Sequence, residues 1–238
     1  GSAMRRGRAG ASTVMRSIME HRFADRAEAG RVLARQLSTR AGRRDVVVLG
    51  LPRGGVPVAF EVAKALGAPL DVLVVRKLGV PMQPELAMGA IASGDALYVD
   101  RHLQHETGVT EAEFARVLSQ ERAELARREA LYRDAWPALP VSGRTVIVVD
   151  DGMATGATLK VAVEALRANA PAAIIAALPV APADAAARLG DSVDELVCAM
   201  KPQVFFSVGQ FYVDVSETAD DEVRDRLARA HRDASWNA

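Results

Sequence analysis

The sequence is poor in cysteine, in aromatic residues and in long hydrophobic runs. Its one cysteine, Cys198, has no partner for an intramolecular disulfide and lies in the apolar run ELVCAM, so we expect a buried and unreactive thiol. No apolar run is long enough to cross a membrane, and no hydrophobic segment follows the N-terminal arginines, as a secretion signal would require. These absences predict a cytoplasmic protein that has no membrane partner and no structural disulfide.

The motifs of several common enzyme classes are also missing. The chain contains no G-x-x-x-x-G-K-[ST] and no G-x-G-x-x-G, which argues against a Walker nucleotide site and against a dinucleotide-binding fold. It contains no G-x-S-x-G, so there is no nucleophile elbow. His102, His105 and Glu106 could suggest a metal site, but no further ligand has suitable spacing, and a solvated loop is the better interpretation.

Charge is balanced in total but not along the chain. The formal net charge is zero, yet residues 1–44 contain 11 Arg and 3 acidic residues, whereas residues 45–238 contain 19 basic and 27 acidic residues. Such a basic segment could bind nucleic acid. The simpler interpretation is a disordered leader over residues 1–22, in which Gly1 to Met4 resemble a remnant of cloning, followed by a helix with arginines on its surface. That interpretation argues against a nucleic-acid partner.

Short apolar runs alternate with helical patterns through most of the chain. The runs are rich in β-branched residues and are bounded by turn residues, which is typical of buried strands. Because strands that alternate with helices form a parallel sheet covered on both faces, we predict an α/β fold with a mainly parallel, twisted sheet flanked by helices, in one domain over residues 23–238. We expect the strands at residues 45–50, 69–77, 145–149, 172–180 and 195–200, and the helices at residues 25–40, 56–67, 156–169 and 183–189.

Two regions depart from this alternation. Residues 86–99 are predicted to form two short extended pieces around a turn at Ser93-Gly94-Asp95. Thr110 and Glu113 match a capping box that opens a long helix, within a helical insertion of about residues 108–136. We expect this helix to end near Arg133, to carry the pairs Glu124/Arg128 and Glu129/Arg133 on its outer side, and to be followed later by an aromatic segment (204–215) and a capped C-terminal helix (218–232).

Polar residues gather where three of the predicted strands end. In an open α/β sheet, ligands bind beyond the carboxyl ends of the strands, and this rule selects residues 51–55, 76–79 and 150–158. In the stretch VIVVDDGMATGATL (146–159), small residues lie at the turn from strand to helix, where open backbone N–H groups and the helix N-terminus favour an anion. We therefore predict a phosphate-binding loop made of Ala154, Thr155, Gly156, Ala157 and Thr158.

Asp150 and Asp151 directly precede this loop. Two carboxylates beside a phosphate would repel the ligand unless it also presents hydroxyl groups, from which carboxylates accept hydrogen bonds, or a divalent cation, which they help to hold. The residues themselves therefore suggest a sugar phosphate bound with a metal. In the alternative, both aspartates are solvated and an Asx-type turn caps the next helix; the loop that follows them argues against this.

The same stretch resembles the signature of the type I phosphoribosyltransferases. That signature is a hydrophobic run, two acids, and a small-residue loop with threonine and glycine, and the match covers about 13 residues. The order of predicted strands and helices from about Phe23 to Val215 is also similar to that of the family. The resemblance implies a pentosyltransferase that uses 5-phosphoribosyl-1-pyrophosphate and Mg²⁺, and that transfers the phosphoribosyl group to a nitrogen acceptor with release of pyrophosphate.

The resemblance also implies roles for individual residues. Asp150 and Asp151 would bind the ribose 2′- and 3′-hydroxyls, directly or through Mg²⁺, and the loop at residues 154–158 would hold the 5′-phosphate. Pyrophosphate would be contacted by a short loop after the first strand and by a basic pair after the second: Arg53 and Lys77 as catalytic residues, with Gly54, Gly55 and Arg76 as binding residues. The alternatives are a surface turn for Arg53 and a solvated strand end for Lys77.

Two larger segments and two single positions complete the resemblance. Residues 100–140 would correspond to the mobile catalytic loop, and residues 201–215 with the C-terminal helix to a small hood over the acceptor. An aromatic cluster lies in that hood, although a plain core would suit it equally well: Phe205, Phe206, Phe211 and Tyr212. Gly152 replaces an apolar residue of the signature, which implies a local backbone adjustment. Ala154 replaces an acid of the 6-oxopurine enzymes, which argues against hypoxanthine or guanine and is more similar to adenine or uracil enzymes.

Two other functions stay open on the sequence alone. Some members of the family bind phosphoribosyl pyrophosphate without catalysis and regulate genes, and the basic N-terminal segment leaves room for such a sensor, although it shows no helix-turn-helix pattern. A sugar-phosphate phosphohydrolase could use the same phosphate loop. The expected partners are small molecules, and a homodimer is one candidate for an oligomeric state that the sequence does not fix.

Overall fold

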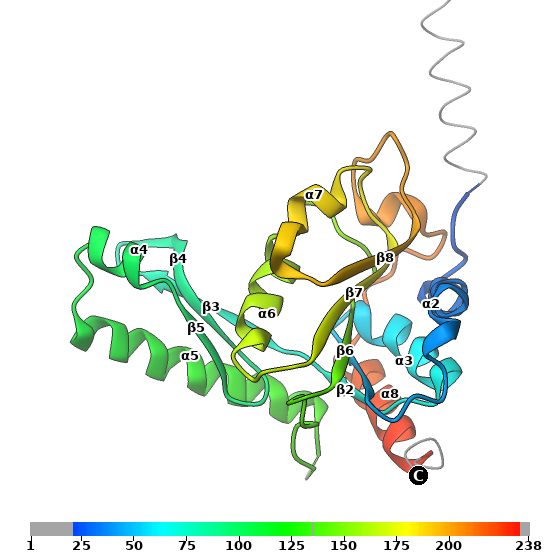
Figure 1. The fold of residues 1–238 in the computed structure, drawn as a ribbon, viewed down its shortest axis with the longest axis horizontal. Helices are drawn as coiled ribbons and strands as arrows, with labels where there is room; N and C mark the ends of the chain where they lie inside the picture. Colours follow the sequence, from blue (N-terminus) through cyan, green and yellow to red (C-terminus); the bar gives the residue numbers. More distant parts are fainter. Residues whose placement is uncertain (1–20, 135, 234–238) are drawn as a thin grey trace, which may run out of the picture.

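The computed structural model describes residues 21–134 and 136–233. Its core is a five-stranded parallel sheet (Figure 1). The strand order is β2-β1-β6-β7-β8, and every neighbouring pair is parallel. The strands are β1 (Val46–Gly50), β2 (Leu70–Val72), β6 (Thr145–Val149), β7 (Ala173–Val180) and β8 (Glu195–Met200). The predicted α/β fold is confirmed. The leader lies, apart from His21 and Arg22, outside the described residues, and the division into leader and single domain stays a prediction.

Helices cover both faces of this sheet. Successive side chains of its central strands point to opposite faces, and each face is buried in its own hydrophobic core. Val47 and Val146 point into the core shared with α6 (Ala157–Arg167) and α7 (Ala185–Leu189), which lie on one side of the sheet in Figure 1. Val46 and Ile147 point into the core shared with α2 (Arg26–Gln36) and α3 (Gly55–Leu66) on the other side. Burial on both faces explains the continuous β-branched runs of the sequence.

The predicted strand at residues 69–77 is two strands. β2 ends at Val72 against β1, and β3 (Val75–Val80) then joins a separate antiparallel sheet, of order β3-β4-β5, with β4 (Gln83–Ala92) and β5 (Ala96–Val99). The change of pairing partner falls at Leu73 and Val74, and the Val74 N–H donates to Ser93 Oγ at 2.9 Å. Nothing in a continuous apolar run marks such a change. The turn predicted at Ser93-Gly94-Asp95 is confirmed, and Gly94 and Asp95 both have positive φ.

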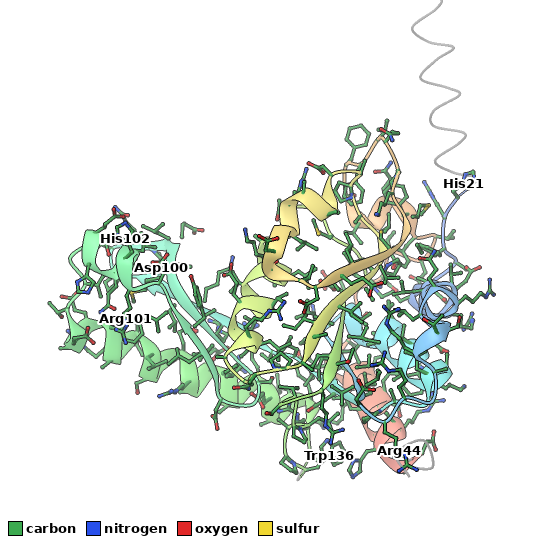
Figure 2. All side chains as sticks on the ribbon, in the orientation of Figure 1. His21, Arg44, Asp100, Arg101, His102 and Trp136 are labelled. Carbon is green, nitrogen blue, oxygen red and sulfur yellow. The ribbon has the colours of Figure 1, made fainter. Side chains whose placement is uncertain are left out.

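The second sheet, with α4 (Arg101–Glu106) and α5 (Glu111–Tyr132), forms an arm that projects from one side of the core (Figure 1). Thr110 is the N-cap of α5, as predicted: its Oγ1 accepts from the Glu113 N–H at 3.1 Å and donates to Glu113 Oε1 at 3.2 Å. The solvated loop expected around His102 is instead helix α4, capped by Asp100, at the far end of the arm (Figure 2). His102 is exposed and pairs with Glu106 at 3.0 Å, and the described residues contain no cluster of three metal-ligating side chains.

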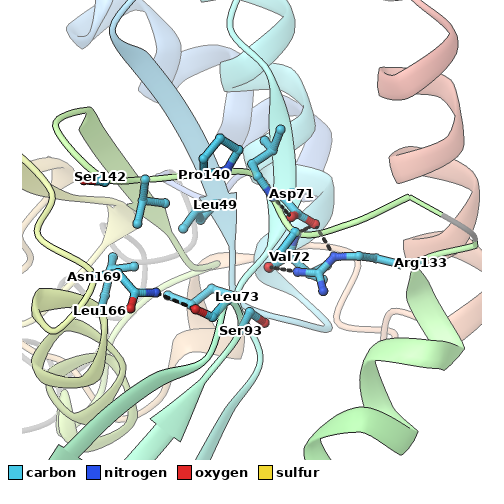
Figure 3. Close-up of a pocket in the computed structure, with 14 residues that line it drawn as sticks. Leu49, Asp71, Val72, Leu73, Ser93, Arg133, Pro140, Ser142, Leu166 and Asn169 are labelled. Atoms are coloured by element: carbon cyan, nitrogen blue, oxygen red, sulfur yellow. Dashed lines mark hydrogen bonds and ion pairs between the residues drawn. The ribbon is translucent and has the colours of Figure 1, made fainter.

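Arg133, expected on the outer side of the long helix, is buried. Its Nε donates to Asp71 Oδ1 at 2.8 Å, and its Nη2 donates to the Val72 carbonyl at 3.1 Å (Figure 3). Arg133 also pairs with Glu129. The second carboxylate oxygen of Asp71 accepts from the Leu139 N–H at 2.9 Å. These charges lie beside a pocket of about 370 Å³ and tie the end of α5 and the chain that returns to β6 onto the edge of the core sheet.

The predicted pair Glu124/Arg128 does lie on the exposed side of α5, at 3.0 Å. The C-terminal helix α8 (Asp220–Arg232) is also present, but its N-cap is Ala219 and no side chain caps it, contrary to prediction. No helix among the described residues is long and apolar enough to cross a membrane. Cys198 is half-buried rather than buried, and burial raises the pKa of its thiol, as expected of an unreactive cysteine.

Candidate active site

The carboxyl ends of β1 and β6 bring two of the predicted loops into contact. A Cβ atom on Gly54 would lie 2.3 Å from Asp151 Oδ2, and one on Gly55 would lie 2.7 Å from the Val149 carbonyl oxygen. Both distances are shorter than real Cβ contacts. At Gly55 the near atom is backbone, so only glycine fits, and at Gly54 a methyl group would force the Asp151 carboxylate to move. The structure therefore places the pair Gly54-Gly55 directly against Asp150-Asp151. The peptide bond between Pro52 and Arg53, at the start of the loop, is cis.

The two aspartates have different surroundings. Asp150 Oδ1 accepts from the Asp151 N–H at 2.8 Å, and burial together with the neighbouring Asp151 carboxylate raises the pKa of Asp150 well above its ordinary value. Asp151 Oδ2 accepts from Arg26 Nε at 3.0 Å. The hydroxyl of Tyr212 donates to the Asp151 carbonyl at 2.7 Å, and burial raises the pKa of this phenol, which stays protonated at neutral pH. Within the described part of the chain, only one carboxylate of the pair therefore forms an ion pair.

The loop at residues 154–158 turns the chain into α6 through Gly156, whose φ is +80°. Gly156 is the N-cap, so neither aspartate caps the helix, in contrast to the alternative considered above. Thr155 Oγ1 accepts weakly from the Ala157 N–H at 3.3 Å, while no hydrogen bond among the described residues uses the N–H groups of Thr158 or Leu159. Thr155 and Thr158 are exposed. The loop thus presents donors to solvent at a helix N-terminus, as an anion site requires.

The predicted basic pair, Arg76 and Lys77, differs in its contacts. Arg76 faces α5 and pairs with Glu121 at 2.7 Å. The side chain of Lys77 is exposed, and no hydrogen bond or ion pair joins its ammonium group to another of the described residues. Both residues and Thr158 line one cleft of about 520 Å³, which is also bounded by the β3–β4 turn at Pro81-Met82. Of the two, Lys77 alone has its charge free.

Arg53 does not line that cleft. Its side chain is partly exposed, and its Nη2 lies 3.4 Å from Glu217 in the segment before α8. Residues 100–140, expected as a mobile loop, are largely the helices α4 and α5. The cleft is bordered both by the turn between β3 and β4 and by residues of α5: Val117, Gln120 and Glu121.

The aromatic segment divides between core and surface. Phe211 and Tyr212 are buried, which favours the plain-core interpretation for both. Phe205 stacks on Phe211 with ring centroids 5.4 Å apart, and Phe206 is 81% exposed.

Gly152 has a packing reason that the sequence did not show. A Cβ atom there would lie 2.8 Å from Cγ1 of Val208, in the short helix Val208–Phe211 that follows β8. Val208 therefore fills the space of the apolar residue that the signature usually carries. Arg188 of α7 was missed as well, and its Nη1 donates to the Ala154 carbonyl at 2.7 Å. The phosphate loop is thus braced from the residues after β7 and β8.

Comparison with protein-family models identifies the family to which this chain belongs. The model of the phosphoribosyl transferase domain matches residues 22–215, which include the core sheet, the arm and the segment after β8. The chain belongs to the phosphoribosyl transferase family. The resemblance inferred from residues 146–158 is confirmed.

Individual relatives of this phosphoribosyl transferase domain agree with the assignment. A protein of Mycobacterium tuberculosis, provisionally named a phosphoribosyl transferase in strains CDC 1551 and H37Rv, is 49% identical over 211 residues, which are 89% of this chain and 47% of the relative. The chain therefore spans about half the length of these curated relatives. The crystal structure of TT1426 from Thermus thermophilus is 39% identical, with a TM-score of 0.77, and the similarity covers 87% of this chain and 98% of that one.

Proposed function

We propose that this chain transfers the phosphoribosyl group of 5-phosphoribosyl-1-pyrophosphate to a nitrogen acceptor, with Mg²⁺ and with release of pyrophosphate. The observation that carries the proposal is the contact between Asp150-Asp151 and Gly54-Gly55, with the open loop at residues 154–158 one turn further along the chain. These parts match the parts of the substrate. The two carboxylates suit the ribose diol, the backbone loop at residues 154–158 suits the 5′-phosphate, and the loop at Gly54-Gly55 suits the pyrophosphate.

Each part of the substrate has a proposed set of residues. The 5′-phosphate would accept from the N–H groups of Thr158 and Leu159 and from the Thr155 hydroxyl. The ribose hydroxyls would donate to Asp150 and Asp151. Three or four charge-assisted hydrogen bonds of roughly 1.5–3 kcal/mol each would suffice for binding between millimolar and micromolar.

The two aspartates would suit a Mg²⁺ ion that takes most of its ligands from the substrate. The described residues provide two adjacent carboxylates and no third acidic or imidazole ligand, and one oxygen of Asp151 is already paired with Arg26. Mg²⁺ commonly takes one or two carboxylates and completes its octahedron with water and substrate phosphates. Bound there, it would supply charge neutralisation to the ribose and pyrophosphate oxygens.

Displacement at the anomeric carbon builds negative charge on the departing pyrophosphate, and the chain's own residues would stabilise that charge. Lys77 is free and lines the cleft beside Thr158, and Arg53 exchanges its weak contact with Glu217 for a phosphate oxygen. The acceptor would approach from the hood at residues 201–215, and Ala154 offers no acid of the kind that 6-oxopurine enzymes use. A cytoplasmic location and a homodimeric assembly stay predictions, which cell fractionation and light scattering would test.

Calorimetry with 5-phosphoribosyl-1-pyrophosphate, with and without Mg²⁺, is the direct test. We expect micromolar binding that weakens when Mg²⁺ is removed. A screen of nitrogen bases would then use pyrophosphate release as its readout. Orthophosphate release would favour a phosphohydrolase, and salt-dependent DNA binding without turnover would favour a sensor. Absence of any binding by the folded protein would reject the transferase.

Gly54→Ala is expected to weaken binding of the substrate by about tenfold or more. The added methyl group would lie only 2.3 Å from Asp151 Oδ2, so the carboxylate would have to move out of its binding position. The backbone of Gly54 is helical, with φ −61°, so alanine fits the conformation and the effect comes from the contact alone. Gly143→Ala is the matched control: its methyl group enters open space, and its positive φ costs stability, about 1 kcal/mol, but not affinity. Equal affinities for wild type and Gly54→Ala would contradict the proposed site.

A further inference from the structure

Arg26 and Tyr212 converge on Asp151 from two distant parts of the chain. Arg26 Nε donates to Asp151 Oδ2 at 3.0 Å, and both side chains are only 20% exposed. The Tyr212 hydroxyl donates to the carbonyl oxygen of the same aspartate at 2.7 Å. The Arg26 guanidinium lies 5.5 Å from the centroid of the Tyr212 ring, so the two residues also contact each other. Asp151 is therefore held at its side chain and at its backbone by one connected pair.

Backbone hydrogen bonds fix both residues of this pair in place. The Phe23 N–H donates to the Phe211 carbonyl at 2.8 Å, and the Val213 N–H donates to the Phe23 carbonyl at 2.8 Å, so the segments on either side of the pair run together. The rings of Phe23 and Tyr212 lie 5.7 Å apart. Arg26 is the first residue of α2, and its Nη1 donates to the Ser216 carbonyl at 2.7 Å. The guanidinium thus has its direction set before any ligand arrives.

We infer that Arg26 and Tyr212 are positioning residues that hold the Asp151 carboxylate in its binding orientation for the phosphoribosyl substrate. The inference rests on the proposed function. Arg26 takes one oxygen of Asp151 and leaves Oδ1 for a ribose hydroxyl or for Mg²⁺. It also offsets the charge of the Asp151 carboxylate, which would otherwise repel a substrate that carries several phosphate charges. Neither residue needs to touch the substrate for this effect.

A double-mutant cycle on Mg²⁺-dependent binding separates this role from a general effect on folding. By calorimetry with 5-phosphoribosyl-1-pyrophosphate, Arg26→Gln is expected to bind about tenfold more weakly than wild type. On the Asp151→Asn background, Arg26→Gln should change the affinity little further, because its effect passes through the Asp151 carboxylate. Arg31→Gln is the matched control, since Arg31 is also on α2, its side chain is 56% exposed, and its one ion pair among the described residues is with Glu61, at 3.9 Å. It should bind as wild type does.

Tyr212→Phe tests the second residue with the smaller change of one hydroxyl group. We expect binding about threefold weaker, as the loss of one hydrogen bond implies. Tyr132→Phe is its control, because it removes a hydroxyl that donates to Asp220 at 3.0 Å, away from the aspartate pair. Arg26→Lys keeps the charge but cannot contact Asp151 and Ser216 together, and should recover part of the affinity lost in Arg26→Gln.

The outcomes distinguish failure of this inference from failure of the proposed function. If wild type does not bind the substrate, both fall. If wild type binds and Arg26→Gln and Tyr212→Phe bind equally well, the inference alone is overturned. Additive effects of Arg26→Gln and Asp151→Asn would also overturn it, because Arg26 would then act elsewhere. Should Arg26→Gln fail to fold, as judged by circular dichroism, Arg26→Lys and Tyr212→Phe carry the same test.

Discussion

The variant in which Asp150 and Asp151 are both replaced by asparagine is expected to fold and to lose its affinity for 5-phosphoribosyl-1-pyrophosphate by about a hundredfold or more. Asparagine has nearly the shape of aspartate, so the contact with the glycine loop is kept. The ribose diol, however, loses two ionised acceptors, and Mg²⁺ loses the carboxylates at this position. Calorimetry against wild type measures the loss, and unchanged pyrophosphate release by the variant would refute the assignment of the site.

The single variant Asp150→Asn should in addition be more stable than wild type at neutral pH. Burial and Asp151 raise the pKa of Asp150, so the folded state disfavours its ionised form and binds a proton more tightly than the unfolded chain does. Ionised Asp150 therefore opposes folding above its raised pKa, and this cost disappears as the pH falls below the ordinary pKa of aspartate, about 4.

Urea unfolding at a series of pH values measures this difference. The stability advantage of Asp150→Asn should be largest at neutral pH and should shrink as the solution is acidified towards about pH 4. Asp151→Asn gives a contrast within the same pair, because it leaves Arg26 without its carboxylate partner and should not stabilise the fold. Ionised Asp150 therefore lowers the stability of the fold. Such a cost is typical of a residue that serves binding rather than folding.

The parts of the site that follow one another in the chain could be predicted from the sequence. Val146 to Thr158 contain the buried strand, the two acids and the loop without interruption, so a local pattern was enough to find them. The fold was predictable for a similar reason, because strands buried on both faces need β-branched runs whatever lies around them. These predictions needed no knowledge of which distant segments meet.

The parts that were missed depend on contacts between distant segments. Arg26 and Asp151 are 125 residues apart, and an arginine at the start of an amphipathic helix resembles any surface arginine until Asp151 is placed beside it. Val208 explains Gly152 in the same way, because it fills space that a local comparison assigns to residue 152 itself. The break at Leu73 and Val74 was invisible because both strand segments are apolar and only their partners differ. Helical periodicity likewise placed Arg133 on an exposed face.

Asp71→Ala is expected to be the most destabilising single substitution considered, at about 3–5 kcal/mol in the free energy of unfolding. It removes the buried acceptor of Arg133 (Figure 3) and of the Leu139 N–H. The guanidinium then keeps only Glu129 and the Val72 carbonyl as partners in the described part of the chain. Glu124→Ala is the matched control, because Glu124 pairs with Arg127 and Arg128 on the exposed side of α5, where solvent screens the ion pairs, and its loss should change the free energy of unfolding far less.

The cause of that loss can be separated from simple loss of packing. Most of the cost of Asp71→Ala should come from the buried guanidinium that has lost one of its two carboxylate partners, so adding Arg133→Met, which removes the charge and keeps apolar bulk, should recover part of the stability. Urea unfolding of the two single variants and the double variant gives the coupling free energy directly. If the double variant is destabilised by the sum of its parts, the ion pair does not join the arm to the core sheet. If stability is recovered, the charge pair at the β2 edge is what fixes the arm, and with it the cleft that contains Lys77.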